Sequence, residues 1–361
     1  MKAVVLDASD RPASVEQVTL KDPGPGEVRV TIKAAGLCHS DLSVLDGSIP
    51  YPTPVVLGHE GAGIVDAIGT GVTAVKEGDA VILSTLAHCG RCRACEIGRP
   101  TECRNAPNPK ETQPFTVQGK PAYQFANASA FAEKTVVREQ CTIPIDTRVP
   151  FDRAALIGCG IMTGVGAVLN RAKVETGSAM AVFGLGGIGL SCVQGGVLAG
   201  AAHIIAVDVV KQKLQLAKQL GATHVVDATT DDPVAAIKEL TNGGADYTFE
   251  AVGNVNVIKQ ALDALGPGGA LTIVGVPKLG SRLDFVVHAL YQNKAILGCR
   301  YGTARPRRDF AMLADLYLGG RLKIDELITR RYALDDFARA LEDLKRGDLA
   351  RGVFMLEGSH G

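Results

Sequence analysis

The chain has 361 residues, a length that predicts two domains of ordinary size. Hydrophobic residues make up 46% and charged residues 21%, which is typical of a globular protein and excludes a disordered chain. Lys+Arg and Asp+Glu number 38 each, aromatic residues make up only 5%, and Trp is absent. A zero net charge with few aromatic residues excludes the basic, stacking surface of nucleic-acid binders, so we expect no nucleic-acid partner.

Residues 1–150 are rich in Val, Gly and Pro and contain short alternating segments such as 27–33, 62–68 and 80–84. Turn signals such as Pro23-Gly24-Pro25-Gly26 separate these segments, which predicts an all-β, barrel-like unit. Residues 107–119 are polar and irregular, so we expect a surface loop there.

From about residue 178 the pattern changes to strands alternating with helices, which predicts a doubly wound parallel sheet. The expected strands are 179–184, 204–208, 224–227, 247–250, 270–274 and 295–298, and the expected helices are 187–199, 211–220, 233–240 and 254–265. Residues 176–207 contain no charged side chain. We interpret that stretch as buried strand, helix and strand rather than a membrane span, and expect no membrane partner. Helices over 309–318 and 334–346 precede a last strand, 352–356, with no obvious place in this sheet.

A glycine-rich loop follows the first of these strands and opens a helix: Gly184, Leu185, Gly186, Gly187, Ile188 and Gly189. The first Gly permits a tight turn, the second lets backbone approach a pyrophosphate, and the third lets helix and strand pack closely. Asp208 ends the next strand, where its carboxylate can accept the ribose hydroxyls of NAD and repel the extra phosphate of NADP. The sequence therefore predicts an NAD site, with a plain packing turn as the alternative.

The nine cysteines are an odd number, and residues 1–18 show no secretory sequence, so we expect a reduced, cytoplasmic protein. Four of them, Cys89, Cys92, Cys95 and Cys103, are separated by two, two and seven residues. Four thiolates this close can enclose one tetrahedral Zn²⁺ in a closed, structural site. An iron–sulfur cluster fits the last spacing poorly, and disulfides fit a reduced compartment poorly.

A second metal set is spread along the chain: Cys38, His59 and Cys159. Two thiolates and one imidazole leave a fourth position open, which is the composition of a catalytic zinc. We therefore expect two Zn²⁺ per chain.

The chain resembles the medium-chain, zinc-containing alcohol dehydrogenases along nearly its whole length. Gly58-His-Glu-x2-Gly63-x5-Gly69-x2-Val72 matches the zinc signature of that family, and the four-cysteine lobe and glycine loop follow in the same order. The resemblance implies an α/β plus β fold. A GroES-like catalytic domain (1–155) with a structural-zinc lobe (89–103) would precede a Rossmann NAD domain (156–298), and residues 299–361 would return to the catalytic domain.

The resemblance also implies roles for individual residues. Cys38, His59 and Cys159 would bind the catalytic zinc, Glu60 would approach the metal during ligand exchange, Ser40 would receive the alcohol proton, and Thr163 would lie beside the nicotinamide. Cofactor contacts are implied for His39, Lys213, Val274, Val276, Cys299, Tyr301 and Arg351.

One position departs from the family pattern. Ser43 stands five residues after Cys38, where many members have a His that ends the proton relay. Serine cannot act as a general base near neutral pH. We predict that the proton passes from Ser40 through the nicotinamide ribose hydroxyl directly to water.

The resemblance implies zinc-dependent oxidation of a primary alcohol, aromatic or medium-chain, to its aldehyde, with hydride transfer to NAD and the reverse. Residues 158–166 also resemble the thiol-dependent branch, so a glutathione- or mycothiol-dependent formaldehyde dehydrogenase is the alternative. A non-catalytic NAD-binding protein on the same scaffold is less favoured, because such proteins typically lack the zinc ligands. The resemblance implies a homodimer or a homotetramer.

Overall fold

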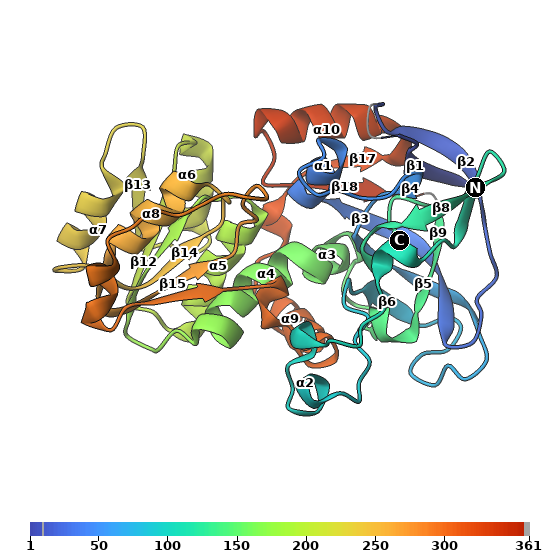
Figure 1. The fold of residues 1–361 in the computed structure, drawn as a ribbon, viewed down its shortest axis with the longest axis horizontal. Helices are drawn as coiled ribbons and strands as arrows, with labels where there is room; N and C mark the ends of the chain where they lie inside the picture. Colours follow the sequence, from blue (N-terminus) through green and yellow to red (C-terminus); the bar gives the residue numbers. More distant parts are fainter. Residues whose placement is uncertain (9–10, 357–361) are drawn as a thin grey trace. The chain divides into compact units, whose positions relative to one another are not determined.

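The computed structural model describes residues 1–8 and 11–356. The chain divides into two compact units (Figure 1): Met1–Cys159 with the segment from Arg305 onward, and Gly160–Ala304. The divisions fall a few residues after the predicted domain limits of 155 and 298.

Two β-structures form the first unit. Five strands close a small barrel in the order β1 (Lys2–Leu6), β2 (Ser14–Leu20), β7 (Phe115–Val117), β8 (Lys120–Gln124) and β4 (Val55–Val56). A seven-stranded sheet has the order β10 (Thr142–Pro144), β6 (Ala80–Leu83), β5 (Glu60–Ile68), β3 (Glu27–Leu37), β18 (Arg351–Met355) and β17 (Ile328–Ala333), with β9 (Lys134–Arg138) paired to β3. This architecture confirms the predicted barrel-like β fold.

Strand β3 shows how the sequence specifies this sheet. Its residues alternate between buried and half-buried up to Ala34, as the alternation in 27–33 predicts. The residues from Ala34 to Leu37 are buried in succession, in the part of β3 that pairs with β5 and β18.

The expected surface loop over 107–119 is wrong for its second half. Residues Phe115–Val117 form strand β7, which pairs with β2 and β8. Phe115 and Val117 are 1% and 2% exposed and belong to the barrel core. Three residues are too few to show a clear alternation among the polar neighbours, so the pattern did not reveal the strand.

The C-terminal segment is part of the first unit. Helices α9 (Pro306–Leu318) and α10 (Phe337–Arg346) precede β18, and β18 pairs antiparallel with β3. Phe354 of β18 lies 4.9 Å from Phe131, ring centre to ring centre, and both are fully buried. The last strand therefore has its partner in this sheet. The remaining helices of the unit are α1 (His39–Leu45), α2 (Arg93–Glu96) and α3 (Phe151–Leu156).

The second unit contains a six-stranded parallel sheet, which confirms the predicted α/β fold (Figure 1). Its strand order is β13 (His224–Asp227), β12 (His203–Asp208), β11 (Ala179–Phe183), β14 (Ala245–Glu250), β15 (Leu265–Ile273) and β16 (Ala295–Gly298). The helices are α4 (Met162–Gly166), α5 (Gly187–Ala199), α6 (Lys211–Gln219), α7 (Pro233–Leu240) and α8 (Val255–Asp263).

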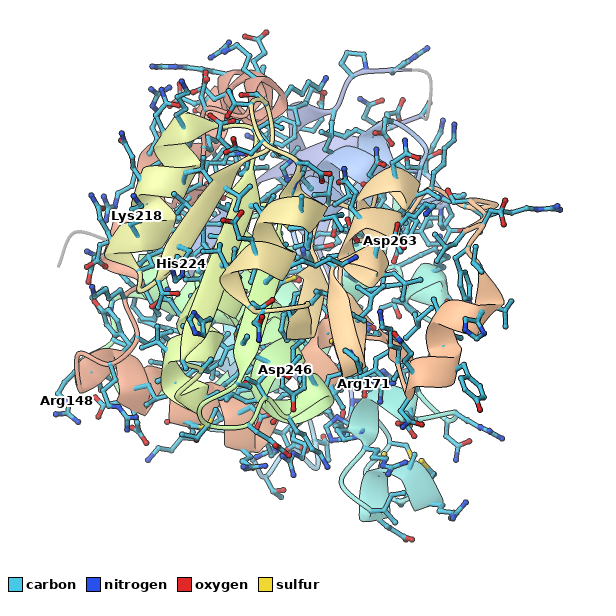
Figure 2. All side chains as sticks on the ribbon, turned by 90° about the vertical axis from the view of Figure 1, so that its left-hand side faces the viewer. Arg148, Arg171, Lys218, His224, Asp246 and Asp263 are labelled. Carbon is cyan, nitrogen blue, oxygen red and sulfur yellow. The ribbon has the colours of Figure 1, made fainter. Side chains whose placement is uncertain are left out.

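Figure 2 labels two carboxylates of this unit, Asp246 on β14 and Asp263 on α8. The Asp246 carboxylate accepts a hydrogen bond from the Ala179 backbone N–H (2.8 Å), which ties the start of β11 to β14. Asp263, the last residue of α8, forms an ion pair with Lys259 one turn earlier (2.8 Å).

The charge-free stretch 176–207 is strand, helix and strand in the structure, as predicted. Among the described residues, one helical stretch, Phe151–Ala172, is long and apolar enough to cross a membrane, with a mean hydropathy of 1.4. However, 83% of its apolar 18-residue span is buried within the protein, as in a core helix.

Candidate active site and metal centres

The three predicted catalytic-zinc ligands meet in the first unit. Cys38 immediately precedes α1, His59 immediately precedes β5, and Cys159 lies in the helical segment after α3. One ligand atom from each of them and from Glu60 lies within 4.8 Å of all the others. Cys38 and His59 are buried, at 8% and 3% exposed. A hydrogen bond from the Cys159 thiol lowers the pKa of Cys38, which favours the thiolate that binds metal.

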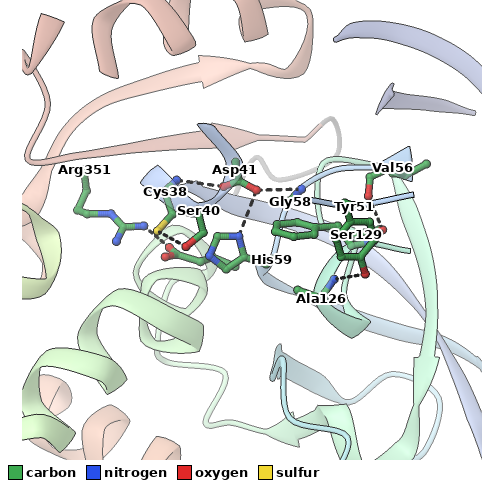
Figure 3. Close-up of polar contacts among 12 residues, drawn as sticks. Cys38, Ser40, Asp41, Tyr51, Val56, Gly58, His59, Ala126, Ser129 and Arg351 are labelled. Atoms are coloured by element: carbon green, nitrogen blue, oxygen red, sulfur yellow. Dashed lines mark hydrogen bonds and ion pairs between the residues drawn. The ribbon is translucent and has the colours of Figure 1, made fainter. Parts of the chain in front are cut away.

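Asp41 orients His59 (Figure 3). The fully buried Asp41 carboxylate accepts hydrogen bonds from the Cys38 N–H (3.2 Å), the Gly58 N–H (3.2 Å) and Nδ1 of His59 (3.1 Å). Burial lowers the pKa of His59, but the Asp41 charge and hydrogen bond outweigh burial and raise it. Because the carboxylate accepts from Nδ1, a neutral His59 carries its proton on Nδ1 and has its lone pair on Nε2, where a metal can bind.

The donor set fits zinc. Nε2 of His59 is buried and has no hydrogen-bond partner among residues 1–8 and 11–356. Buried polar atoms are rarely left unpaired in folded proteins, so this nitrogen is available to a ligand. It faces the cluster that contains both thiols, and sulfur with imidazole nitrogen is a ligand set that Zn²⁺ prefers. Cys38, His59 and Cys159 would hold the ion, with Glu60 near enough to replace a ligand.

Glu60 forms a buried ion pair with Arg351, whose Nη2 donates to the Glu60 carboxylate (Figure 3). Burial raises the pKa of Glu60 to about 7, although the Arg351 charge opposes this rise. Gly36 lies opposite Glu60 in the β3–β5 pairing, and any side chain at Gly36 would collide with the carboxylate. Arg351 is only 4% exposed, and its guanidinium pairs with the Glu60 carboxylate. The predicted contact of Arg351 with the pyrophosphate of the cofactor stays a prediction.

Ser40 lies beside the same cluster. Its Oγ is 4.0 Å from Sγ of Cys38, on the first turn of α1. Ser43 is one turn further along this helix and half-buried, and His39 is exposed. The structure therefore brings Ser40 to the metal ligands, as a proton acceptor for the alcohol would require.

The four-cysteine lobe forms a separate cluster around α2. Sγ–Sγ distances are 3.5 Å for Cys92–Cys95, 3.8 Å for Cys92–Cys103 and 4.0 Å for Cys89–Cys95. Four sulfurs at the usual Zn–S distance of about 2.3 Å on a tetrahedron are about 3.8 Å apart, so this cluster fits a structural zinc. The same distances are far longer than the ~2.05 Å of a disulfide bond.

The glycine loop of the second unit joins β11 to α5. Gly184 has φ +87°, a conformation that favours glycine, and a side chain at Gly189 would collide with the Gly184 carbonyl. A Cβ at Gly186 would meet nothing within 4 Å, so there is open space over the helix N-terminus, where a phosphate binds. Leu185 is buried, and Gly187 and Ile188 begin α5.

Asp208 has a second task that the sequence did not indicate. Its carboxylate accepts hydrogen bonds from the Leu185 N–H (2.6 Å) and the Val210 N–H (2.9 Å). Asp208 therefore anchors the glycine loop to the end of β12, in addition to its predicted contact with ribose.

The other predicted cofactor residues also lie in the second unit. Thr163 (6% exposed) and Val274 (5%) are buried, Val276 is 70% exposed, and Tyr301 has a positive φ of 55°. Lys213 is on α6, and Cys299 follows β16 with a half-buried thiol whose pKa partial burial raises to about 11. Their roles stay predictions.

Two contributors to the metal site escaped the sequence analysis. Asp41 was signalled only by its position three residues after Cys38, where its carboxylate caps the start of α1. The ring of Phe125 packs edge-on against His59, with ring centres 5.5 Å apart, and nothing in the sequence linked these two residues.

Comparison with known proteins decides the family. Residues 24–147 match the alcohol dehydrogenase GroES-like domain, and residues 187–318 match the zinc-binding dehydrogenase family. The class-3 alcohol dehydrogenase of Oryza sativa subsp. japonica is 38% identical over 369 residues, which cover 99% of this chain and 97% of the relative. The chain belongs to the zinc-containing medium-chain alcohol dehydrogenases.

Other similarities place this dehydrogenase within that family. The S-(hydroxymethyl)glutathione dehydrogenase of Saccharomyces cerevisiae is 38% identical, with 97% of this chain and 95% of the relative covered. The crystal structure of benzyl alcohol dehydrogenase from Acinetobacter calcoaceticus superposes with a TM-score of 0.93 at 37% identity, covering 98% and 99% of the two chains. An alcohol dehydrogenase zinc-binding domain protein from Burkholderia ambifaria gives a TM-score of 0.94 at 38% identity, covering 98% of each chain.

Proposed function

We propose that this dehydrogenase oxidises a primary alcohol with an aromatic or medium-length apolar group to its aldehyde, with NAD as hydride acceptor, and catalyses the reverse reaction. The observation that carries the proposal is the buried Cys38, His59 and Cys159 cluster with the Ser40 hydroxyl beside it. The similarity to a benzyl alcohol dehydrogenase supports an aromatic substrate. When bound, zinc would act as a Lewis acid and NAD would accept the hydride.

Each side chain of the cluster then has a distinct task. Cys38 and Cys159 offset the charge of the ion, and His59, held by Asp41, presents Nε2 to it. Glu60, paired with Arg351, is a carboxylate that can exchange with a ligand. Ser40 accepts the alcohol proton, which then leaves without a terminal imidazole because Ser43 cannot act as a base.

A kinetic comparison tests this proposal. We would measure initial NADH formation with benzyl alcohol, and NADH formation from formaldehyde with and without glutathione or mycothiol. Oxidation of benzyl alcohol without a thiol is the expected result. NADH formation only from formaldehyde with a thiol would replace the proposal with the thiol-dependent formaldehyde dehydrogenase, which the yeast relative supports. A zinc content near one per chain instead of two would favour the non-catalytic alternative.

The preference for NAD over NADP rests on Asp208. We expect Asp208→Gly to lower the ratio of kcat/KM with NAD to kcat/KM with NADP, because the carboxylate no longer repels a 2′-phosphate. Since Asp208 also anchors Leu185, the KM for both nucleotides should rise in this variant. An unchanged ratio would remove Asp208 from the selection of the nucleotide. The comparison matters because a related structure from Sinorhizobium meliloti, 28% identical with a TM-score of 0.84, is bound to NADP.

We also propose that the protein is a cytoplasmic homodimer or homotetramer. Strand β16 is at the edge of the six-stranded sheet, and exposed apolar side chains precede it: Leu279 (84% exposed), Val286 (75%), Val287 (72%) and Tyr291 (83%). Such a group of exposed apolar side chains next to a sheet edge is typical of a surface that another chain covers. Light scattering of the purified protein should give two or four times the mass of one chain, and a monomer would refute the proposal.

A further inference from the structure

A left-handed turn lies next to the metal-ligand cluster of the first unit. Ala126, Asn127 and Ser129 have φ of +50°, +58° and +50°, although none of them is glycine. Residues with a Cβ rarely adopt this conformation, and a backbone of this kind persists where its surroundings hold it. Three such residues within four positions therefore indicate that neighbouring groups fix the shape of the turn.

The hydroxyl of Tyr51 is one of these groups (Figure 3). It donates a hydrogen bond to the Gln124 carbonyl (2.7 Å) and accepts one from the Ala126 N–H (3.3 Å). Burial raises the pKa of Tyr51 to about 12, so the hydroxyl keeps its proton and can donate and accept together. The Tyr51 hydroxyl thus bridges Gln124, which precedes the turn, and Ala126, which is the first residue of the turn with a positive φ.

Two further side chains complete the support. The buried Ser129 hydroxyl donates to the Val56 carbonyl (2.7 Å) and accepts from the Phe125 N–H (2.9 Å). The Asn127 amide donates to the Thr85 carbonyl (2.9 Å). The middle of the turn is therefore tied to the segment after β6, and its end is tied to β4.

The turn holds one aromatic ring in place. Phe125 is 5% exposed, and its ring is edge-on to the Tyr51 ring (centres 5.2 Å apart, 83° between planes) and to the imidazole of His59 (5.5 Å, 83°). Edge-to-face contacts of this kind are favourable and depend on geometry. A small change in the turn would therefore move the ring relative to a metal ligand.

We propose that Tyr51 is a positioning residue for substrate selection: it holds the turn 125–129 so that Phe125 forms a fixed apolar wall beside His59. The substrate class that such a wall favours is a primary alcohol whose hydroxyl-bearing carbon is attached to a flat aromatic group. A two-carbon alcohol has too little surface to contact the wall. The inference rests on the proposed function, to which it adds Tyr51 as the residue that sets the preference for aromatic over short aliphatic alcohols.

The main test is Tyr51→Phe, which removes the hydroxyl and keeps the ring. We expect the KM for benzyl alcohol to rise about tenfold with kcat within a factor of about two, and kcat/KM for ethanol to change less than about twofold. Tenfold corresponds to about 1.4 kcal/mol, within reach of one edge-to-face contact. Tyr247→Phe is the matched control, since the Tyr247 hydroxyl also meets a backbone group, at Glu175, but in the second unit. Equal losses for both alcohols, or no change for either, would overturn the inference.

A second readout does not depend on any substrate. In Tyr51→Phe the Ala126 N–H loses its acceptor, so deuterium uptake in a peptide over 124–130 should increase while the zinc content stays at the wild-type value. Unchanged uptake would refute the positioning role whether or not the enzyme oxidises alcohols. Increased uptake in a protein that oxidises no alcohol would instead refute the proposed function.

If Tyr51→Phe does not fold, Phe125→Leu tests the wall directly. It should lower the ratio of kcat/KM for benzyl alcohol to that for ethanol about tenfold. An unchanged ratio in Phe125→Leu would refute the inference.

Discussion

The contact between Asp41 and His59 allows a quantitative test of the metal centre by Asp41→Asn. The Asp41 carboxylate is fully buried and accepts three hydrogen bonds, from Cys38, Gly58 and His59. An amide has one oxygen and one NH2 group, so whichever way it is placed, its NH2 group faces at least one of these donors. At least one buried donor therefore loses its acceptor, and the negative charge that holds the proton on Nδ1 of His59 is lost.

The magnitude follows from two terms. An unsatisfied buried donor costs about 1–3 kcal/mol of folding stability. Loss of an outer partner of a metal-ligating His typically costs about 10–100-fold in metal affinity, which is about 1.4–2.8 kcal/mol. Because Asp41 also caps the segment that carries Cys38, we expect Asp41→Asn to fall in the upper half of that range.

The assay is competition for zinc by a chelator with mass-spectrometric counting of the zinc retained. Wild type and Asp41→Asn should lose the structural zinc at the same chelator concentration, because Cys89, Cys92, Cys95 and Cys103 form a separate cluster. The variant should lose the second zinc at a chelator concentration about 30–100-fold lower. Asp46→Asn is the control, since Asp46 is exposed just after the same helix. Equal retention of both zinc ions would refute the role assigned to Asp41.

Three further predictions concern other parts of the chain. Asp152 is 3% exposed and bonded to Arg153 and Arg331 (2.8 Å and 2.9 Å); burial raises its pKa, but the two guanidinium groups outweigh burial and lower it. The stabilisation from a carboxylate with a lowered pKa is present above about pH 4 and is lost progressively as the pH falls through the lowered value. Asp152→Asn should therefore cost about 2 kcal/mol in urea unfolding at pH 7 and progressively less as the pH falls below 4; a cost that does not change with pH would contradict this. Burial raises the pKa of Cys141 to about 12, so iodoacetamide at pH 8 should leave Cys141 unmodified in the native protein, and modification at the rate of the unfolded chain would be the contrary result. Ser43→His should speed proton release and change the dependence of kcat on pH, whereas an unchanged profile would count against a relay from Ser40 through the ribose hydroxyl directly to water.

The fold could be predicted where local patterns are strong. Strands β11 and β16 of the second unit are short apolar runs, and the helix predicted over 187–199 is α5 with the same limits. Strand β7 was missed because its three residues lie among polar neighbours and become a strand only by pairing with β2 and β8. Its stability comes from barrel closure, which no local pattern contains.

The metal ligands could be predicted because their chemistry is restricted to a few residue types at recognisable spacings. The residues that orient them could not. Asp41, Tyr51 and Phe125 are common residue types, and their tasks arise from contacts between segments far apart in the chain, such as the 5.5 Å approach of Phe125 to His59. The sequence shows which side chains can bind a metal, whereas the contacts that fix their positions arise only in the folded structure.

Charge balance explains why so many ionisable groups can be buried together in the first unit. Glu60 offsets Arg351, and Asp41 is balanced by the donors of Cys38, Gly58 and His59. The two thiols of Cys38 and Cys159 share one hydrogen bond, which lowers the pKa of Cys38, while that same contact and burial raise the pKa of Cys159 well above its usual range. Zinc binds both as thiolates, so we expect its binding to release at least the Cys159 proton and its affinity to rise with pH.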